Sequence, residues 1–250
     1  MEQKKNSYHV KEIDAKTARN IIKKYHYSKK VVSNSDIHLG VFNKEDALVG
    51  CLQYGMPLNK KSTPIKLCKN YDWRNMRELS RMVMRDEELR NSESMAISLC
   101  NKWLKKNRPD IKWLLSFSDG KENNVGYIYQ ATNWIYLGYM VSKSFYKIDN
   151  EWVHGVTVWH RYKEKHPLRE TNTTNEIVCM EHENVSIIEC KQHIYVYKLS
   201  KDVIFNFQPK PYPKMNTELP ILSRSVLKLD GIVFTPPKKI KYAEFYKGII

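Results

Sequence analysis

The chain has 250 residues, with 42 lysines and arginines against 27 aspartates and glutamates, and a formal net charge of +15. This length can bury the core of one or two domains, and no apolar run approaches the roughly 20 residues that a membrane helix needs. The positive excess favours a polyanion such as nucleic acid as a partner. The alternative is the lysine-rich composition of an AT-rich genome.

Cysteine use and the N-terminus bear on the compartment. The five cysteines are dispersed, and no two are spaced as Cys-x-x-Cys, which argues against a zinc site and a disulfide framework. The first residues carry lysines with no apolar segment behind them, so we do not expect a secretory signal. We therefore expect a cytoplasmic protein.

The N-terminal part predicts a helix, a hairpin and a strand. Asp14 is an N-cap candidate for an amphipathic helix that ends near Tyr25. Two strand-like runs, 38–42 and 47–54, flank a polar turn and predict a hairpin. A further strand is expected over 76–84.

The central part continues the alternation. Apolar residues recur at helical spacing over 92–107, and a buried strand is expected over 113–117. A short helix begins near Val125, and strands are expected at 136–146 and 152–159. This order of elements predicts an α/β fold, a mixed sheet flanked by helices.

The C-terminal part differs in composition. Short β-rich runs are expected at 177–180, 185–189 and 193–199, and prolines become frequent after them. We predict a first domain over 1–164 and a β-rich appendage with a proline-containing tail over 165–250.

Asp119 closes the buried central strand and is followed by Gly120. Ligands of open α/β sheets bind in the crevice outside the carboxyl ends of the strands, so Asp119 is a candidate site residue. The structural alternative is a simple turn, for which Asp and Gly are common residues.

Two further motifs have both a structural and a functional interpretation. His26 follows the first helix, where a histidine can simply complement the helix dipole. Arg81, in the predicted strand, can serve as an ion-pair partner of Glu78 or Glu93.

The start of the long helix is polar, with Asn91, Ser92 and Ser94. The serines can act as caps only. A helix start of this kind is also an anion site, because its backbone N–H groups can hold a pyrophosphate.

As an ordered set over about residues 8 to 162, these motifs resemble the phage Mom family of adenine-modifying enzymes, a divergent branch of the GNAT superfamily. The glycine-rich loop usual in that superfamily is replaced by 85–91. The matching segments are His26-Tyr27-Ser28, the hairpin runs 39–42 and 48–50, Glu78-Leu79-Ser80-Arg81, Asn91-Ser92-Glu93-Ser94, Asp119-Gly120, 126–134 and 136–138.

The resemblance implies a GNAT-like fold and modification of adenine N6 in double-stranded DNA, giving a carbamoylmethyl-type group that protects phage DNA from host restriction. It implies acetyl-CoA as acyl donor, iron as metal, and the host cytoplasm as location. His26, Tyr27 and Asp119 match the segments of the implied iron site. Tyr129 joins them as a catalytic candidate. Where many relatives carry a histidine, this chain has Asn124-Val125.

Arg81, Asn91, Ser92 and Ser94 are the candidate cofactor-binding residues, since they match the family positions or open the long helix. Lys29 and Lys30, next to His26, are candidate DNA contacts. An adenine that is modified in a duplex is expected to flip out and stack on aromatic side chains. The nearest candidates, any of which can instead be core, are Tyr25, Tyr27, Tyr129 and Trp134.

Two other functions remain open at this point. One is a GNAT enzyme that acetylates another amine, on a modified base or a protein lysine. The other is a nucleic-acid-binding protein without enzymatic activity.

Overall fold

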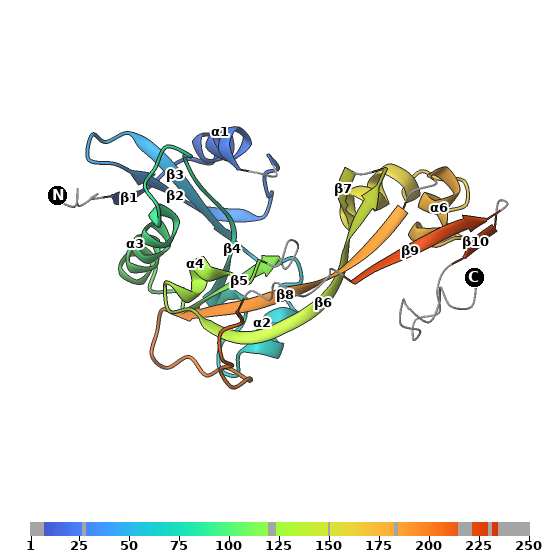
Figure 1. Cartoon of the computed structure of the whole chain (residues 1–250). Coiled ribbons are helices and arrows are strands. Elements are labelled where there is room, and N and C mark those ends of the chain that lie inside the picture. The colour runs from blue at the N-terminus through green and yellow to red at the C-terminus, as the bar shows by residue number, and fades with distance from the viewer. Residues whose placement is uncertain are drawn as a thin grey trace. The chain divides into compact units, whose positions relative to one another are not determined.

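Figure 1 shows the computed structural model, which describes residues 8–26, 29–119, 124–149, 151–182, 185–214, 222–229 and 232–234. The chain forms two compact units that alternate along the sequence. The predicted domain boundary at residue 164 stays a prediction. The first unit comprises 1–118, 126–138 and 193–213, and the second comprises 119–125, 139–192 and 214–250.

A mixed sheet forms the centre of the first unit, and helices lie on both of its faces, which confirms the predicted fold class. Strands β1 to β4 are antiparallel neighbours, whereas β4 and β5 are parallel. The last two strands, β8 and β6, continue into the second unit. The spatial order is β1 (His9–Glu12), β2 (Ser35–Phe42), β3 (Leu48–Gly55), β4 (Met76–Met84), β5 (Trp113–Asp119), β8 (Val185–Lys198) and β6 (Ile135–Ile148).

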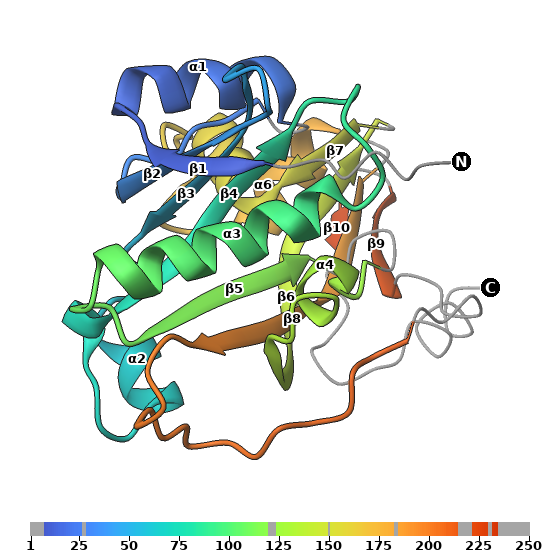
Figure 2. The same cartoon turned by 90° about the vertical axis from the view of Figure 1, so that its left-hand side faces the viewer.

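Side-chain alternation shows which helices share a face of this sheet. On β3, Cys51 and Gly55 point to the same face; Cys51 packs under α1, and Gly55 pairs with Glu78, which pairs with Leu115. Leu115 packs with α2, so α1 and α2 lie on one face, whereas Leu114 packs with α3 on the other. Figure 2 shows α3 in front of the strands. The helices are α1 (Ala15–Tyr25), α2 (Ser62–Leu67), α3 (Ser92–Asn107) and α4 (Tyr127–Gln130), with a 3-10 turn at Trp73–Asn75.

The strongest sequence signals correspond to observed elements. The Asp14 carboxylate accepts hydrogen bonds from the backbone N–H groups of Lys16 and Thr17, both at 2.9 Å, and α1 ends at Tyr25 as predicted. The predictions of β4 and of α3 match the observed bounds. No described helix has the length and apolar character needed to cross a membrane.

The second unit has its own small core. Tyr146, Val158 and Val178 are among the buried residues of that core. Besides the second unit's parts of β6 and β8, the elements are β7 (Glu151–His154), α5 (Gly155–Val158), the π-helical turn Trp159–Lys163, α6 (Thr174–Glu181), β9 (Leu222–Leu229) and β10 (Ile232–Phe234).

Three secondary-structure predictions were wrong. The strand predicted over 152–159 ends at His154, where the His154 side chain caps α5. The run 177–180 lies inside α6, which a capping box of Thr173 and Glu176 starts. In addition, no helix was expected between the runs 47–54 and 76–84, where α2 forms; Pro64 lies in its first turn, where a missing N–H is tolerated.

Candidate functional site

Strands β4 and β5 separate after a short stretch of pairing. Their ladder covers only Met76–Glu78 against Trp113–Leu115, although both strands continue beyond it. A side chain bridges the opening: the Ser116 hydroxyl donates to the Leu79 carbonyl oxygen at 3.0 Å. Backbone groups that a full ladder would satisfy therefore border this opening, where a ligand can pair with them.

A cavity of about 470 Å³ lies on the α3 face of the sheet, beside this opening. Such a volume is typical of small-molecule sites. Asn91 has a left-handed φ of 71° and makes no side-chain cap bond, so no side chain of the N-cap occupies the N–H groups of the first turn. The cavity is lined by Met84, Arg85, Asp86, 88–94, Tyr127, Ile128 and Ala131.

The charges around this cavity are mixed. Arg90 lines it together with Asp86, Glu88 and Glu93, whereas the Arg85 guanidinium carbon lies 5.7 Å from the Tyr25 ring centroid, at the end of α1, so the arginine side chains alone do not make the cavity positive. An anion there would rest on the backbone N–H groups at the start of α3 together with Arg90.

Tyr129 belongs to helix α4, which lines the cavity, and its ring packs into the core. Its ring centroid is 5.1 Å from that of Tyr195 and 5.3 Å from that of Trp134. The Tyr129 and Ser116 hydroxyl oxygens lie 2.8 Å apart, and because Ser116 gives its single proton to the Leu79 carbonyl oxygen, Tyr129 is the donor in this bond, which places the phenol at the opening between β4 and β5. Trp134 is fully buried and Tyr129 is 8% exposed, so both are core residues.

Five polar side chains gather on the opposite face, which α1 covers; we call them the α1-face cluster. His26 caps the C-terminal end of α1 and is buried, and Gln53 donates to His38 Nδ1 at 3.0 Å. Arg81 pairs in register with Gln53, and its side chain donates to the carbonyl oxygens of Lys30 and Ser80. The members of the α1-face cluster are His26, His38, Gln53, Glu78 and Arg81.

Burial shifts the pKa of three groups in this cluster, and it lowers the pKa of His38. It raises the pKa of Glu78 to about 7, against the opposing effect of Arg81. It also lowers the pKa of His26 to about 4, and the Arg81 charge acts in the same direction. None of the ion pairs among the described residues involves Arg81, so the structural alternative of a pair with Glu78 or Glu93 is not observed. A carboxyl that changes protonation near neutral pH is suited to acid–base chemistry.

The backbone explains why Glu78, named from the sequence only as an alternative ion-pair partner of Arg81 and in a family motif, was not chosen as a site residue. In a regular strand, residues three positions apart point to opposite faces, which would separate Glu78 from Arg81. A bulge at Ser80 inserts one residue, because Gln53 pairs with Arg81 while Tyr54 pairs with Leu79. The bulge turns Glu78 and Arg81 to the same face, and the sequence carries no clear signal for it.

Gln53 was missed as well. It is fully buried, and its Oε1 atom has no hydrogen-bond partner within the described part of the chain. An unpaired buried acceptor costs about 1–3 kcal/mol of folding free energy, which indicates that Gln53 has a role other than core packing. The signal for it in the sequence was a polar residue within an otherwise apolar strand.

The structure separates the predicted site residues into two groups. Arg81 lies with His26 on the α1 face, whereas Asn91, Ser92 and Ser94 line the cavity on the α3 face. Lys29 and Lys30 are exposed directly after His26, and the Lys30 carbonyl is held by Arg81. Tyr27 lies outside the described residues, and Asp119 is described only as the last residue of β5.

The predicted iron site was tested against the side chains that the structure describes. They contain no group of three His, Cys, Asp or Glu side chains that could hold a metal. His26 is a neutral imidazole, which suits a ligand, but Arg81 lies near enough to depress its pKa. The described residues by themselves do not fit an iron centre.

Comparisons with known proteins add the following findings. A model of the Mom protein family matches residues 7–214. Methylcarbamoylase mom of Escherichia phage Mu is 42% identical over 149 residues, which are 60% of this chain and 61% of that protein. The chain thus spans about three fifths of the length of this relative.

Solved structures were found as well. An N-acetyltransferase from Staphylococcus aureus Mu50 matches at 12% identity and a TM-score of 0.40, over 77% of this chain and 98% of that chain. A GNAT family N-acetyltransferase from Escherichia coli in complex with CoA matches at 9% identity and a TM-score of 0.36, over 54% and 72%.

Proposed function

Because the chain belongs to the Mom protein family, we propose that it modifies adenine in phage DNA, converting N6 to a carbamoylmethyl-type group that protects the DNA from host restriction. The phage Mu relative is named a methylcarbamoylase, which supports this class of reaction. The net charge of +15 suits a DNA substrate. The observation that carries the proposal is a sheet opening with a cavity on one face and a polar cluster on the other.

The α3 face is proposed to hold acetyl-CoA. The pyrophosphate would rest on the N–H groups at the start of α3, near Arg90. The acyl arm would enter the opening between β4 and β5, where backbone groups of β4 have no ladder partner on β5. The Tyr129 phenol, which donates to Ser116, would redirect its proton toward the thioester oxygen when the acyl arm enters the opening.

The α1 face is proposed to hold the flipped adenine. Any route that forms a bond at N6 must remove one proton from the amino group, and Glu78 is the candidate base. Its pKa of about 7 leaves a useful ionised fraction at neutral pH. Arg81 favours the ionised form of Glu78, which supports this role.

Nucleoside mass spectrometry of DNA from expressing cells tests the proposal. A carbamoylmethyl-sized mass increase on deoxyadenosine is expected. An acetyl group on another base or on protein lysines would favour a different GNAT reaction. Unmodified DNA with retained DNA binding would favour a binding protein without activity.

Acetyl-CoA binding has its own expected result. Millimolar acetyl-CoA should raise the melting temperature, because a ligand at 100 times its Kd adds about 2.7 kcal/mol of stability. Arg90→Glu should reduce this increase, since it reverses a charge that lines the cavity. Arg19→Glu, at an exposed position of α1, is the matched control and should leave the increase in melting temperature intact. A melting temperature that is insensitive to acetyl-CoA would contradict a CoA enzyme.

Iron remains a proposal that rests on the family resemblance, and no catalytic step is derived through it. If His26 and Asp119 are ligands, anaerobically purified wild type contains iron, and His26→Ala or Asp119→Ala lowers the iron content without unfolding the protein. Metal analysis with circular dichroism measures both. Wild-type iron content in the two variants would reject the assignment.

A further inference from the structure

The surface around α2 exposes large apolar side chains. Leu58 is 95% exposed and Ile65 is 69% exposed, and Ile204 and Phe207 lie on the neighbouring chain segment at 52% and 47%. This segment is held against α2, because the side-chain amide of Asn206 donates to the carbonyl oxygens of Ile65 and Lys66. Clustered apolar exposure of this kind marks an interaction surface.

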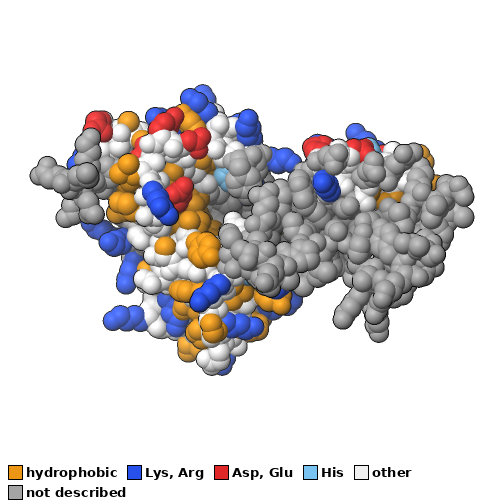
Figure 3. Space-filling view, viewed as in Figure 1, with side chains coloured by type: hydrophobic (Ala, Val, Ile, Leu, Met, Phe, Trp, Pro, Cys, Tyr) orange, Lys and Arg blue, Asp and Glu red, His pale blue; other side chains and the backbone are white. Residues whose placement is uncertain are grey.

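The same surface is positively charged. None of its exposed lysines has an ion-pair partner among the described residues. The nearby carboxylates are engaged: Asp72 pairs with Arg74 at 2.7 Å, and Asp202 accepts from Tyr71 and Ser200. Figure 3 shows basic and apolar side chains intermingled at the lower end of the first unit. The lysines are Lys60, Lys61, Lys66 and Lys69.

An aromatic ring adds to this surface. The Lys60 ammonium lies 5.1 Å from the Trp73 ring centroid, and the Arg74 guanidinium carbon lies 5.3 Å from it. Each contact holds a cation in place on a partly exposed ring. Because Arg74 is paired with Asp72, the charge that this ring holds in place for a partner is that of Lys60.

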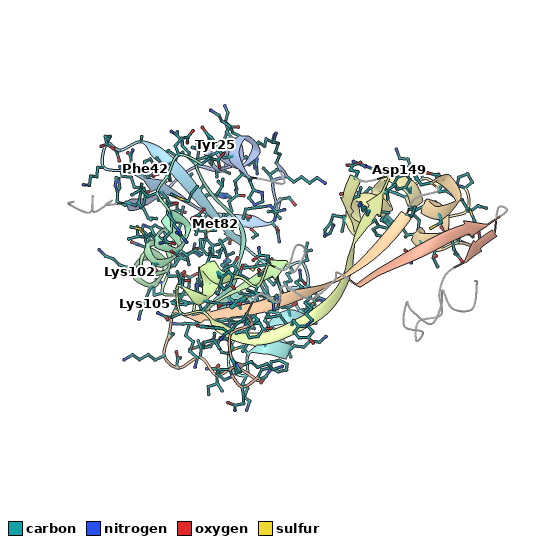
Figure 4. The ribbon with its side chains drawn as sticks, in the orientation of Figure 1. Tyr25, Phe42, Met82, Lys102, Lys105 and Asp149 are labelled. Atoms are coloured by element: carbon teal, nitrogen blue, oxygen red, sulfur yellow. The ribbon has the colours of Figure 1, made fainter. Side chains whose placement is uncertain are left out.

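The location of this surface indicates which kind of partner it binds. Helix α2 lies on the same face of the sheet as α1 and the α1-face cluster, with Leu115 packed beneath it and Glu78 beside Leu115 in the ladder. A large substrate that reaches Glu78 therefore approaches the sheet on the face that α2 covers. Other exposed lysines, Lys105 and Lys106, are on α3, on the opposite face of the sheet, and Figure 4 labels Lys105.

We infer that the surface around α2 is a second DNA-binding surface, which holds the duplex flanking the adenine that is modified. This inference rests on the proposed function. The lysines neutralise backbone phosphates, and Leu58 and Ile65 contact the minor groove, where apolar side chains of other proteins insert between base steps.

Salt-dependent binding of a fluorescent 20-base-pair duplex, measured without acetyl-CoA, tests the inference. Each phosphate contact changes the slope of log K against log salt by about 0.9. Lys61→Glu with Lys66→Glu should make the slope less steep by about 2 and weaken binding about tenfold or more. Lys105→Glu with Lys106→Glu changes the net charge equally and should stay within about twofold of wild type.

The outcomes separate this inference from the proposed function. If wild type binds duplex DNA and both double variants weaken it equally, the inference is overturned while the DNA substrate stands. If wild type does not bind DNA, both fail. Tighter binding to phosphatidylserine vesicles than to DNA, or a dimer in sedimentation that Leu58→Ser with Ile65→Ser dissociates, would also overturn the inference by identifying another occupant.

Discussion

Glu78→Gln is expected to lower the rate of adenine modification by about 100-fold or more, the range that general-base catalysis supplies. Glutamine keeps the size of the side chain and cannot accept the N6 proton. In the wild type, activity at limiting DNA should rise with pH through about 7, because Glu78 must be ionised to act. The variant should lack this ascending limb in its residual rate.

The same substitution should increase stability at alkaline pH. The pKa of Glu78 is raised from 4.5 to about 7, so between these values the native state keeps a proton that the unfolded state has released. The stabilising contribution is fully present below pH 4.5 and is lost as pH rises through about 7. Glu78→Gln has no such loss and should melt above wild type at pH 8.

Melting curves over pH 5–8 and single-turnover modification assays therefore distinguish two roles. Lost activity with gained alkaline stability identifies a carboxyl kept for chemistry at a cost to the fold. If Glu78→Gln destabilises the protein at pH 8 and keeps its activity, Glu78 is a structural residue and the proposed base is wrong.

The elements that the sequence predicted best are those with a local signal. Asp14 and the periodicity behind it define α1, and the apolar run from Trp113 defines β5. The errors arose where a local pattern has two solutions. The apolar run 177–180 is too short for its periodicity to distinguish a strand from a helix. In the structure it is helical, because the capping box at Thr173 starts α6 before it.

The candidate site depends more on long-range structure. The start of α3 was predictable, because Asn91, Ser92 and Ser94 precede a helical pattern and the cavity forms beside them. The α1-face cluster was not predictable, since it needs the bulge at Ser80 and the register that sets Gln53 beside Arg81. A bulge depends on pairing with another strand, which single-sequence patterns do not record.

The Tyr129 hydroxyl lies at the opening between β4 and β5, between the cavity on the α3 face and the α1-face cluster. Gly126, with a positive φ of 76°, starts its helix and allows Tyr129 to pack against Tyr195, since a Cβ at Gly126 would lie 2.7 Å from the Tyr195 ring. The Tyr129 hydroxyl is bonded to Ser116, which bridges to β4 through Leu79. This arrangement aims a phenol at the opening rather than at either surface.

Tyr129→Phe is therefore expected to reduce modification by about 100-fold, as loss of one preorganised hydrogen-bond donor does in other enzymes. Stability should fall by only about 1 kcal/mol, because the ring contacts remain and Ser116 can still donate to Leu79. Acetyl-CoA should still raise the melting temperature, since the cavity residues are unchanged.

Tyr136→Phe is the matched control for this prediction. Tyr136 belongs to the same aromatic cluster, with its ring centroid 5.2 Å from that of Tyr195, and its hydroxyl bonds to His193 Nδ1 at 2.8 Å. It therefore loses a buried phenol hydroxyl without touching Ser116, and should retain activity within a few-fold of wild type. Equal losses in Tyr129→Phe and Tyr136→Phe would show that the aromatic core, and not a proton donor at the opening, determines the rate.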